Sequence, residues 1–207
     1  MTDFKFCQSV IAVTAVTMPG RPPDAPYESD EDDPVTLRFA LDPELTTELR
    51  QQIVTLWTVV TNAGGAVGFV APVSEDEVRT VAEAAFAGIA EGPDRLLVGY
   101  TDDNRPAAFL IFTSNRFALK EHWQVLKRVM VHPGLQGTGN GVALMAEAER
   151  VGRELGLEAL QVTVRGGLNL ERFYQRCGYR EVGRLPAALR LSPGDDRDEI
   201  LMWLPLV

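Results

Sequence analysis

The stretch Val129–Gly141, VMVHPGLQGTGNG, decides the fold of this chain. A run of apolar residues ends at Val131, and Pro133, which has no backbone N–H, ends the strand ladder. The turn that follows has three glycines within residues 137–141, and a helix with an apolar face begins there. Glycine allows the backbone to adopt left-handed conformations and to approach a ligand closely. The stretch therefore predicts a buried strand, a turn with free N–H groups and a helix in direct succession.

Such a turn is a candidate anion site, since free amides and the positive end of the helix dipole converge on it. A nucleoside triphosphate loop needs a lysine after its last glycine, and none follows Gly139 or Gly141. The dinucleotide fingerprint nearly fits from Gly139, but Leu144 stands where its last glycine belongs. A turn without a ligand is disfavoured, because clustered glycines at a helix start cost stability. A pyrophosphate is the expected occupant.

The segments on both sides of this stretch indicate a mixed α/β fold around one central sheet. Apolar runs and alternation predict strands at 35–40, 96–101, 107–113, 123–131, 159–164, 179–184 and 199–206. Helical spacing and capping residues predict helices that begin at Asp42-Pro43-Glu44 and at Ser74, and further helices over about 138–155 and 169–176.

Residues 1–34 differ in composition from the rest of the chain. Pro19–Pro34 is rich in proline and acid and has almost no large apolar residues, which predicts a flexible linker. Phe4–Thr17 fits either a strand or an unstructured extension. We expect residues 35–207 to form the folded domain.

Composition excludes several classes of protein. The 207 residues are 45% hydrophobic and 24% charged, as in soluble globular proteins, and the net charge of −9 argues against nucleic-acid binding. No apolar run approaches the roughly 20 residues of a membrane helix. The only cysteines, Cys7 and Cys177, imply no disulfide framework, so we expect a cytoplasmic protein without membrane partners. In so acidic a chain, an anionic ligand must be held by local amides and nearby basic residues.

Two motifs resemble those of a known family. The spacing Gln136-x-x-Gly139-x-Gly141 after a Val-x-Val-x-Pro strand resembles the acyl-CoA motif of the GCN5-related N-acetyltransferase (GNAT) superfamily. Downstream, 171–179 (ERFYQRCGY) is similar to the Phe-Tyr-x-x-x-Gly-Phe/Tyr segment of that family. The motifs lie in the family's order, and the resemblance covers roughly 35–207. Asn140 departs from it, because the family has an aliphatic or basic residue there.

The resemblance implies a mostly antiparallel sheet with helices on both faces and an enzyme that moves an acetyl group from acetyl-CoA to an amine. It implies that Val129 and Val131 pair with the pantetheine arm and that an N–H near Val129 or Met130 stabilises the oxyanion. The amides of Gln136 to Gly141 would hold the pyrophosphate. The expected cofactor-binding residues are Val129, Met130, Val131, Gln136, Gly137, Thr138, Gly139, Asn140, Gly141, Asn169, Phe173 and Tyr174.

Tyr174 is the expected general acid, which gives a proton to the departing thiolate; the alternative is an aromatic packing residue beside Phe173. Glu121 and His122 are candidate bases, with a solvated strand end as the alternative. Asn169 either caps the short helix or reaches the cofactor.

Two features of the sequence bear on the acceptor of the acetyl group. Acidic residues at 195–199, placed by the predicted strands in a loop, either attract a cationic amine or form a solvated turn: Asp195, Asp196, Asp198 and Glu199. The Gly64–Pro72 loop is similar to the acceptor-side loop of some family members. We expect a small-molecule primary amine, no metal, and a monomer or homodimer. Acetylation of protein N-termini or lysines and a non-catalytic acyl-CoA sensor are the alternatives.

Overall fold

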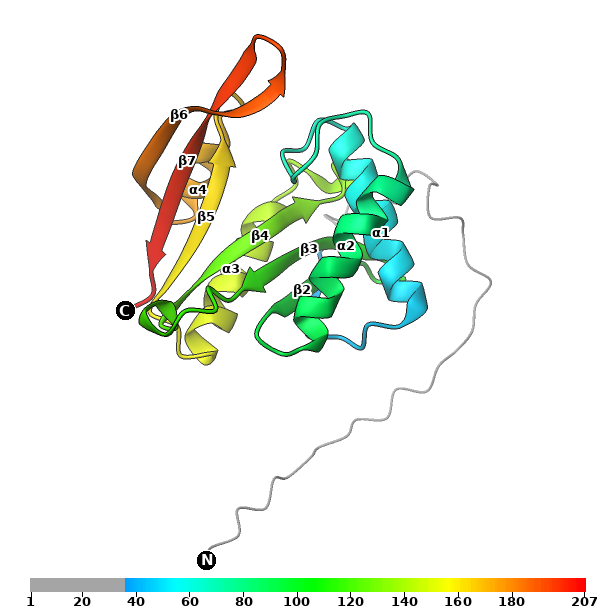
Figure 1. Cartoon of the computed structure of the whole chain (residues 1–207). Helices are drawn as coiled ribbons and strands as arrows, with labels where there is room; N and C mark the ends of the chain where they lie inside the picture. Colours follow the sequence, from blue (N-terminus) through cyan, green and yellow to red (C-terminus); the bar gives the residue numbers. More distant parts are fainter. Residues whose placement is uncertain (1–35) are drawn as a thin grey trace, which may run out of the picture.

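The computed structural model describes residues 36–207 (Figure 1), so the predicted extension and linker at 1–34 lie outside the described residues. Within that range the chain forms one seven-stranded sheet and four α-helices. The strands are β1 Arg38–Leu41, β2 Arg95–Tyr100, β3 Pro106–Thr113, β4 Trp123–Val131, β5 Ala159–Arg165, β6 Arg180–Ser192 and β7 Asp195–Pro205. The helices are α1 Thr47–Asn62, α2 Glu75–Ala90, α3 Asn140–Glu154 and α4 Leu170–Arg176.

The sheet is mixed and mostly antiparallel, as predicted. Its strand order is β1-β2-β3-β4-β5-β7-β6, and β4 with β5 is the parallel pair. Alternate residues of the strands point to opposite faces. Leu96 and Val98 of β2 pack in one core with α1 and α2, whereas Leu97 packs in the other core with α3 and Tyr174 of α4. The helices therefore cover both faces of the sheet (Figure 1).

The strands β4 and β5 separate along their length (Figure 1). They pair only over Trp123–Leu126 and Ala159–Val162, although β4 continues to Val131 and β5 to Arg165. The separation coincides with a bulge in β4, where Arg128 and Val129 stand opposite the single residue Leu110 of β3. Arg128 has a left-handed φ of 56°, which bends the strand locally. Backbone groups on the inner edges of β4 and β5 are thus left without strand partners.

One predicted helix start is wrong. The helix α1 begins at Thr47, and Thr46 is its cap, with its side chain accepting a hydrogen bond from the Leu49 amide at 3.1 Å. Asp42 adopts a left-handed φ of 49° instead, and its carboxylate accepts a hydrogen bond from the Leu96 amide at 3.0 Å. The acid therefore joins β1 to β2, a long-range role that local capping preferences do not reveal. The capping box predicted at Ser74 is present.

The predicted loop before the last strand is also wrong. The strand β6 runs to Ser192 and β7 begins at Asp195, so these residues form a long two-stranded arm that extends past the body of the sheet (Figure 1). Most residues of β6 are exposed. Because no buried face imposes apolar alternation there, the sequence carries little strand signal over 185–192. The backbone pairing with β7 supplies the order.

The loop 63–73 between α1 and α2 is anchored to α1. The Asn62 side chain donates to the Val73 carbonyl at 3.0 Å and accepts from the Val73 amide at 2.9 Å. The Trp57 indole donates to the Val67 carbonyl at 2.9 Å. These contacts fix both the end and the middle of the loop, so it has a defined position above the sheet. In the part of the chain that the structure describes, no helix has the length and apolar content needed to cross a membrane.

We predict that Asn62→Ala destabilises the protein by roughly 1–3 kcal/mol, because two backbone groups of Val73 lose their partner. Urea denaturation of the variant measures this change. Gln52→Ala on the same helix is the control, since Gln52 makes only an exposed side-chain hydrogen bond to Glu48. Equal stabilities of the two variants would contradict a role for Asn62 in holding the loop.

Candidate active site

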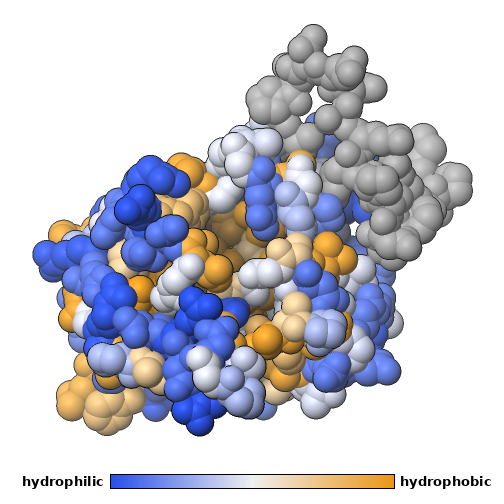
Figure 2. Space-filling model, turned by 90° about the horizontal axis from the view of Figure 1, so that it is seen from above, coloured by the Kyte–Doolittle hydropathy of each residue, from blue (hydrophilic) through white to orange (hydrophobic). Residues whose placement is uncertain are grey.

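Two cavities open beside the separation of β4 and β5. The glycine-loop cavity, of about 660 Å³, is lined by Val131, the turn at Gln136–Gly141, Leu144 of α3 and Phe173 of α4. The arm cavity, of about 620 Å³, is lined by residues 66–70, 125–129 and 188–191 and by Glu199. Both cavities are lined by Ala66, Val67, Val129, Thr163, Arg165 and Tyr174. Seen from above, the molecule has an apolar hollow near the centre of the face (Figure 2).

The turn before α3 leaves its backbone amides available. Gly137 and Gly139 adopt left-handed φ values of 82° and 93°, and Gly139 caps α3 without a side-chain hydrogen bond. Among the described residues, no backbone acceptor takes the amides of residues 137–141. These amides and the helix dipole form the anion site that the sequence predicts.

The polar side chains of the same turn form hydrogen bonds within the segment 131–140. The Gln136 amide donates to the Val131 carbonyl at 2.9 Å, and the Thr138 hydroxyl donates to the Leu135 carbonyl at 2.9 Å. Asn140 is buried and donates to the Thr138 hydroxyl at 2.9 Å. The unusual residue at 140 therefore adds a hydrogen bond and leaves the helix start well packed.

Tyr174 lies at the junction of the two cavities. It is 8% exposed, and its ring packs edge-on against Phe173 and Tyr179, with centroids 5.1 Å and 5.7 Å apart. Burial raises the pKa of the Tyr174 hydroxyl far above its ordinary value. The hydroxyl therefore keeps its proton at neutral pH. Packing and proton donation are compatible here, because the same ring contacts hold the hydroxyl in place.

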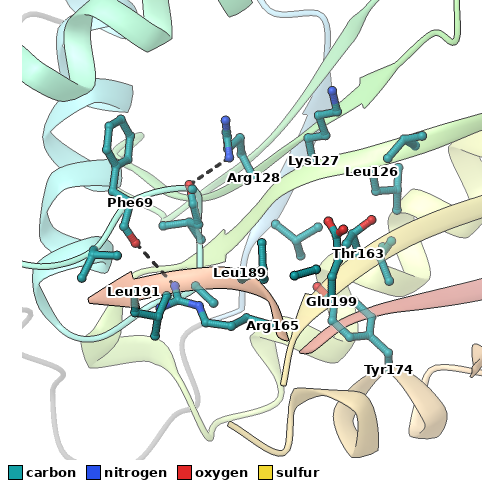
Figure 3. A pocket seen from close by; sticks show the side chains of 18 of the residues that line it. Phe69, Leu126, Lys127, Arg128, Thr163, Arg165, Tyr174, Leu189, Leu191 and Glu199 are labelled. Atoms are coloured by element: carbon teal, nitrogen blue, oxygen red, sulfur yellow. Dashed lines mark hydrogen bonds between the residues drawn. The ribbon is translucent and has the colours of Figure 1, made fainter. Parts of the chain in front are cut away.

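Two arginines reach the loop above the arm cavity (Figure 3). Arg128 donates from Nη1 to the Val67 carbonyl at 3.2 Å, and its guanidinium lies 4.8 Å from the centre of the Trp57 ring. Arg165 donates from Nη2 to the Phe69 carbonyl at 3.4 Å. Burial is the main cause that lowers the pKa of both groups, and both stay cationic because an arginine begins far above neutrality.

Glu199 is the carboxylate of the arm cavity. It stands opposite Arg165 in the register of β7 and β5 and lines the cavity beside Thr163 and Tyr174 (Figure 3). The neighbouring acids are engaged elsewhere: Asp195 pairs with Arg197, Asp196 with Arg190 and Asp198 with Arg184. The acidic cluster of the sequence is thus a set of strand ion pairs, and Glu199 is the member that faces the cavity.

The predicted bases lie elsewhere. Glu121 and His122 precede β4 at its paired end, whereas Tyr174 lines the separated end, and neither residue lines a cavity. The geometry gives no support to a catalytic role for them.

The other predicted cofactor residues divide into two groups. Val129, Val131, Phe173 and the glycines of the turn line the glycine-loop cavity. The Met130 side chain is buried in the core with α1 and α2, and Met130 stands opposite Phe109 of β3 in the register of the sheet. Asn169 has a left-handed φ of 55°, makes no side-chain cap hydrogen bond and lines neither cavity, although Leu168 and Leu170 do. The Asn169 side chain thus neither caps α4 nor lines the cavity proposed below for the cofactor.

Sequence reasoning missed Arg128 and Arg165. Arg128 follows Lys127 in the second half of β4, and Arg165 is the last residue of β5; a charge within these largely apolar strands is the available signal. His132 and Cys177 are explained by their roles in the fold. His132 accepts a hydrogen bond at Nδ1 from the Gly134 amide at 3.1 Å, which stabilises the turn. Burial raises the pKa of the Cys177 thiol, which disfavours a thiolate nucleophile.

The comparisons with known proteins agree with this geometry. A putative acetyltransferase of the GNAT family from Desulfovibrio desulfuricans has a TM-score of 0.63 at 21% identity, over 82% of this chain and 100% of its own. A putative acetyltransferase from Salmonella typhimurium, solved with its cofactor acetyl-CoA, has a TM-score of 0.63 at 18% identity, over 84% and 95%. A ribosomal-protein-alanine N-acetyltransferase from Brucella melitensis has a TM-score of 0.65 at 17% identity, over 83% and 99%.

At these identities the three structures establish the fold alone. The family follows from a separate match, in which residues 66–179 fit the Acetyltransferase (GNAT) family. This range contains both sequence motifs, the turn at 136–141 and the segment at 171–179. The chain therefore belongs to the GNAT family of acetyltransferases.

Proposed function

We propose that this protein is an N-acetyltransferase that moves an acetyl group from acetyl-CoA to the primary amine of a small molecule. One observation carries the proposal: the glycine-loop cavity and the arm cavity meet at Tyr174, a buried tyrosine that lines both. The first cavity offers a site for the acyl donor and the second for the acceptor. A direct transfer needs such a junction, because donor and acceptor must touch.

The glycine-loop cavity suits acetyl-CoA. The free amides at 137–141 match a pyrophosphate, and the edge of β4 around Val129 offers strand-like pairing to the pantetheine arm. The Val131 carbonyl is already bonded to the Gln136 side chain. In this proposal Val129 is therefore the main strand partner, and Val131 contributes through its position in the wall. The amide at Val129 or Met130 is the expected oxyanion donor.

The chemistry requires one bond to form and one to break. The neutral amine nitrogen attacks the thioester carbonyl, the C–N bond forms, and the C–S bond of the tetrahedral intermediate breaks. Tyr174 gives its proton to the departing thiolate, and the proton lost by the amine passes to solvent or to Glu199, which lines the acceptor side. The products are an N-acetylated amine and coenzyme A.

Thiol release on mixing the protein with acetyl-CoA and primary amines tests the activity. Amine-dependent release of coenzyme A is the expected result. Tight acetyl-CoA binding without turnover on any amine would instead identify a sensor, and turnover with peptides alone would identify a protein acetyltransferase.

We predict that Gly139→Val lowers the affinity for coenzyme A at least about tenfold, because a branched side chain is strained at a left-handed φ of 93° and disturbs the amides. Isothermal titration calorimetry measures the affinity. Gly156→Val is the matched control, since Gly156 has a φ of 73°, follows α3 and lines neither cavity. Both variants should lose stability, but only Gly139→Val should lose affinity for coenzyme A. Equal affinities of the two variants for coenzyme A would contradict the anion site.

We predict that Tyr174→Phe lowers kcat by about a hundredfold or more while the coenzyme A affinity is unchanged. Because burial raises the pKa of this hydroxyl above its ordinary value of 10.0, the proton is retained as the pH rises. The kcat of the natural protein should therefore show no loss of this acid below about pH 10. Steady-state kinetics over pH checks both statements.

Tyr179→Phe is the matched control for this prediction. The Tyr179 hydroxyl is buried without a hydrogen-bond partner and lines neither cavity. Its removal should leave kcat unchanged and alter the free energy of unfolding by no more than about 1 kcal/mol. A Tyr174→Phe variant as active as Tyr179→Phe would overturn the acid role.

A further inference from the structure

The charge of the arm cavity is opposite to that of the chain. The protein carries 29 acidic and 20 basic residues. Among the residues that line this cavity, the basic side chains are Lys127, Arg128, Arg165 and Arg190, and the acidic side chain is Glu199. An excess of cations in one cavity of an acidic protein points to a ligand with negative charge.

Ion pairing removes only part of this positive charge. Arg190 is held by both oxygens of Asp196, at 2.7 Å and 2.8 Å, and is neutralised. Within residues 36–207, no carboxylate forms an ion pair with Arg128 or Arg165. Asp195, which is paired with Arg197, acts on Arg165 only at longer range. Because neither guanidinium has a carboxylate of residues 36–207 in direct contact, binding of an anion from outside is favoured there.

The two guanidinium groups are fixed in place but not saturated. Each donates to one carbonyl of the loop, Arg128 to Val67 and Arg165 to Phe69, and a guanidinium has further N–H donors. Those further donors have no acceptor among the described residues. The loop contacts limit the motion of both side chains, which reduces the entropy lost when an anion binds. This is the arrangement expected of a carboxylate or phosphate site.

The cavity also separates positive from negative charge. Arg165 and Glu199 are opposite each other in the register of β5 and β7, yet no ion pair within 4.0 Å joins them. In Figure 3 Arg165 extends toward Phe69, whereas Glu199 lies with Thr163 and Tyr174 at the other side. The anionic end of the cavity is thus the end beside Tyr174, and the Arg165 guanidinium lies away from it.

We propose that the acceptor is a small zwitterionic amine whose carboxylate or phosphate is bound by Arg128 and Arg165, while its amino group lies beside Glu199 and Tyr174. This inference rests on the proposed function and adds the substrate class. Acetyl-CoA does not account for Arg128, which lines only the arm cavity, and the free amides for a pyrophosphate lie in the other cavity. Arg165 lines both cavities, and its hydrogen bond to the Phe69 carbonyl directs it toward the part of the loop that lines the arm cavity.

The first test compares matched acceptors on the natural protein. L-amino acids are measured beside their carboxamides, O-phosphoethanolamine beside ethanolamine, and spermidine and an acidic peptide are added. A kcat/KM at least about tenfold higher for the anionic member of a pair supports the proposal. Preference in the amino acid pairs identifies a carboxylate, and preference in the phosphoethanolamine pair identifies a phosphate. Equal use of both members, or turnover of spermidine or the peptide alone, overturns it.

The second test removes one arginine. Arg165→Gln should raise KM for the preferred anionic acceptor at least about tenfold more than it raises KM for the neutral counterpart, and Arg165→Lys should restore part of the difference. Lys120→Gln is the matched control, because Lys120 is exposed and lines neither cavity. A uniform loss for both acceptors in Arg165→Gln would contradict anion recognition.

The outcomes separate the two proposals. If neutral amines are acetylated as well as anionic ones, the acetyltransferase assignment stands and the zwitterion inference fails. If acetyl-CoA binds and no amine is acetylated, both fail. Calorimetry with acetyl-CoA on Arg165→Gln distinguishes a defect in donor binding from a defect in acceptor binding, since Arg165 lines both cavities.

Discussion

The loss of pairing between β4 and β5 after Leu126 and Val162 is the constraint on which the rest of the structure depends. If β4 and β5 paired along their whole length, the backbone groups of residues 127–131 that face β5 would be hydrogen-bonded to it. No strand edge would then be available to a ligand. The bulge at Arg128 and Val129 turns β4 away while its pairing with β3 continues to Val131. The sheet is therefore continuous on one side of β4 and open on the other. Both cavities exist because of this difference.

The same bulge determines where a positive charge lies. Arg128 has a left-handed φ of 56°, and its guanidinium lies over the Trp57 ring and bonds to the Val67 carbonyl. Gly68 lies beside it at a left-handed φ of 103°, and a Cβ there would lie 2.0 Å from the Arg128 Nη1, so the guanidinium would have to move. The strand bulge, the glycine and the loop thus depend on one another. A single backbone irregularity coincides with the opening of the sheet and also places a cation in the arm cavity.

Local constraints made the end of β4, the glycine turn and the start of α3 predictable from the sequence. Val131, Pro133 and the glycines at 137–141 each have few conformations that fit, and together they specify a strand, a turn and a helix start. The arm cavity was not predictable in the same way. Arg128, Arg165 and Glu199 come from three strands, and only the register of β5 with β7 and the bulge of β4 bring them to one cavity. The arm was missed because β6 is exposed along most of its length and lacks the apolar alternation of a buried strand.

A net negative chain can still contain a cationic cavity, because the net charge and the groups in the cavity affect an anion over different distances. At physiological ionic strength the field of exposed charges is screened beyond about 8 Å, so the net charge of −9 has little effect on an anion that is already bound. Amides at 137–141 and guanidinium groups in a partly buried cavity act at contact distance, where screening is weak. The acidic surface therefore slows the approach of anions more than it weakens their binding. Affinity for an anionic ligand depends on the few groups it touches. The paired acids on β7 can therefore lie close to Arg128 and Arg165, which form no ion pair with the described residues 36–207.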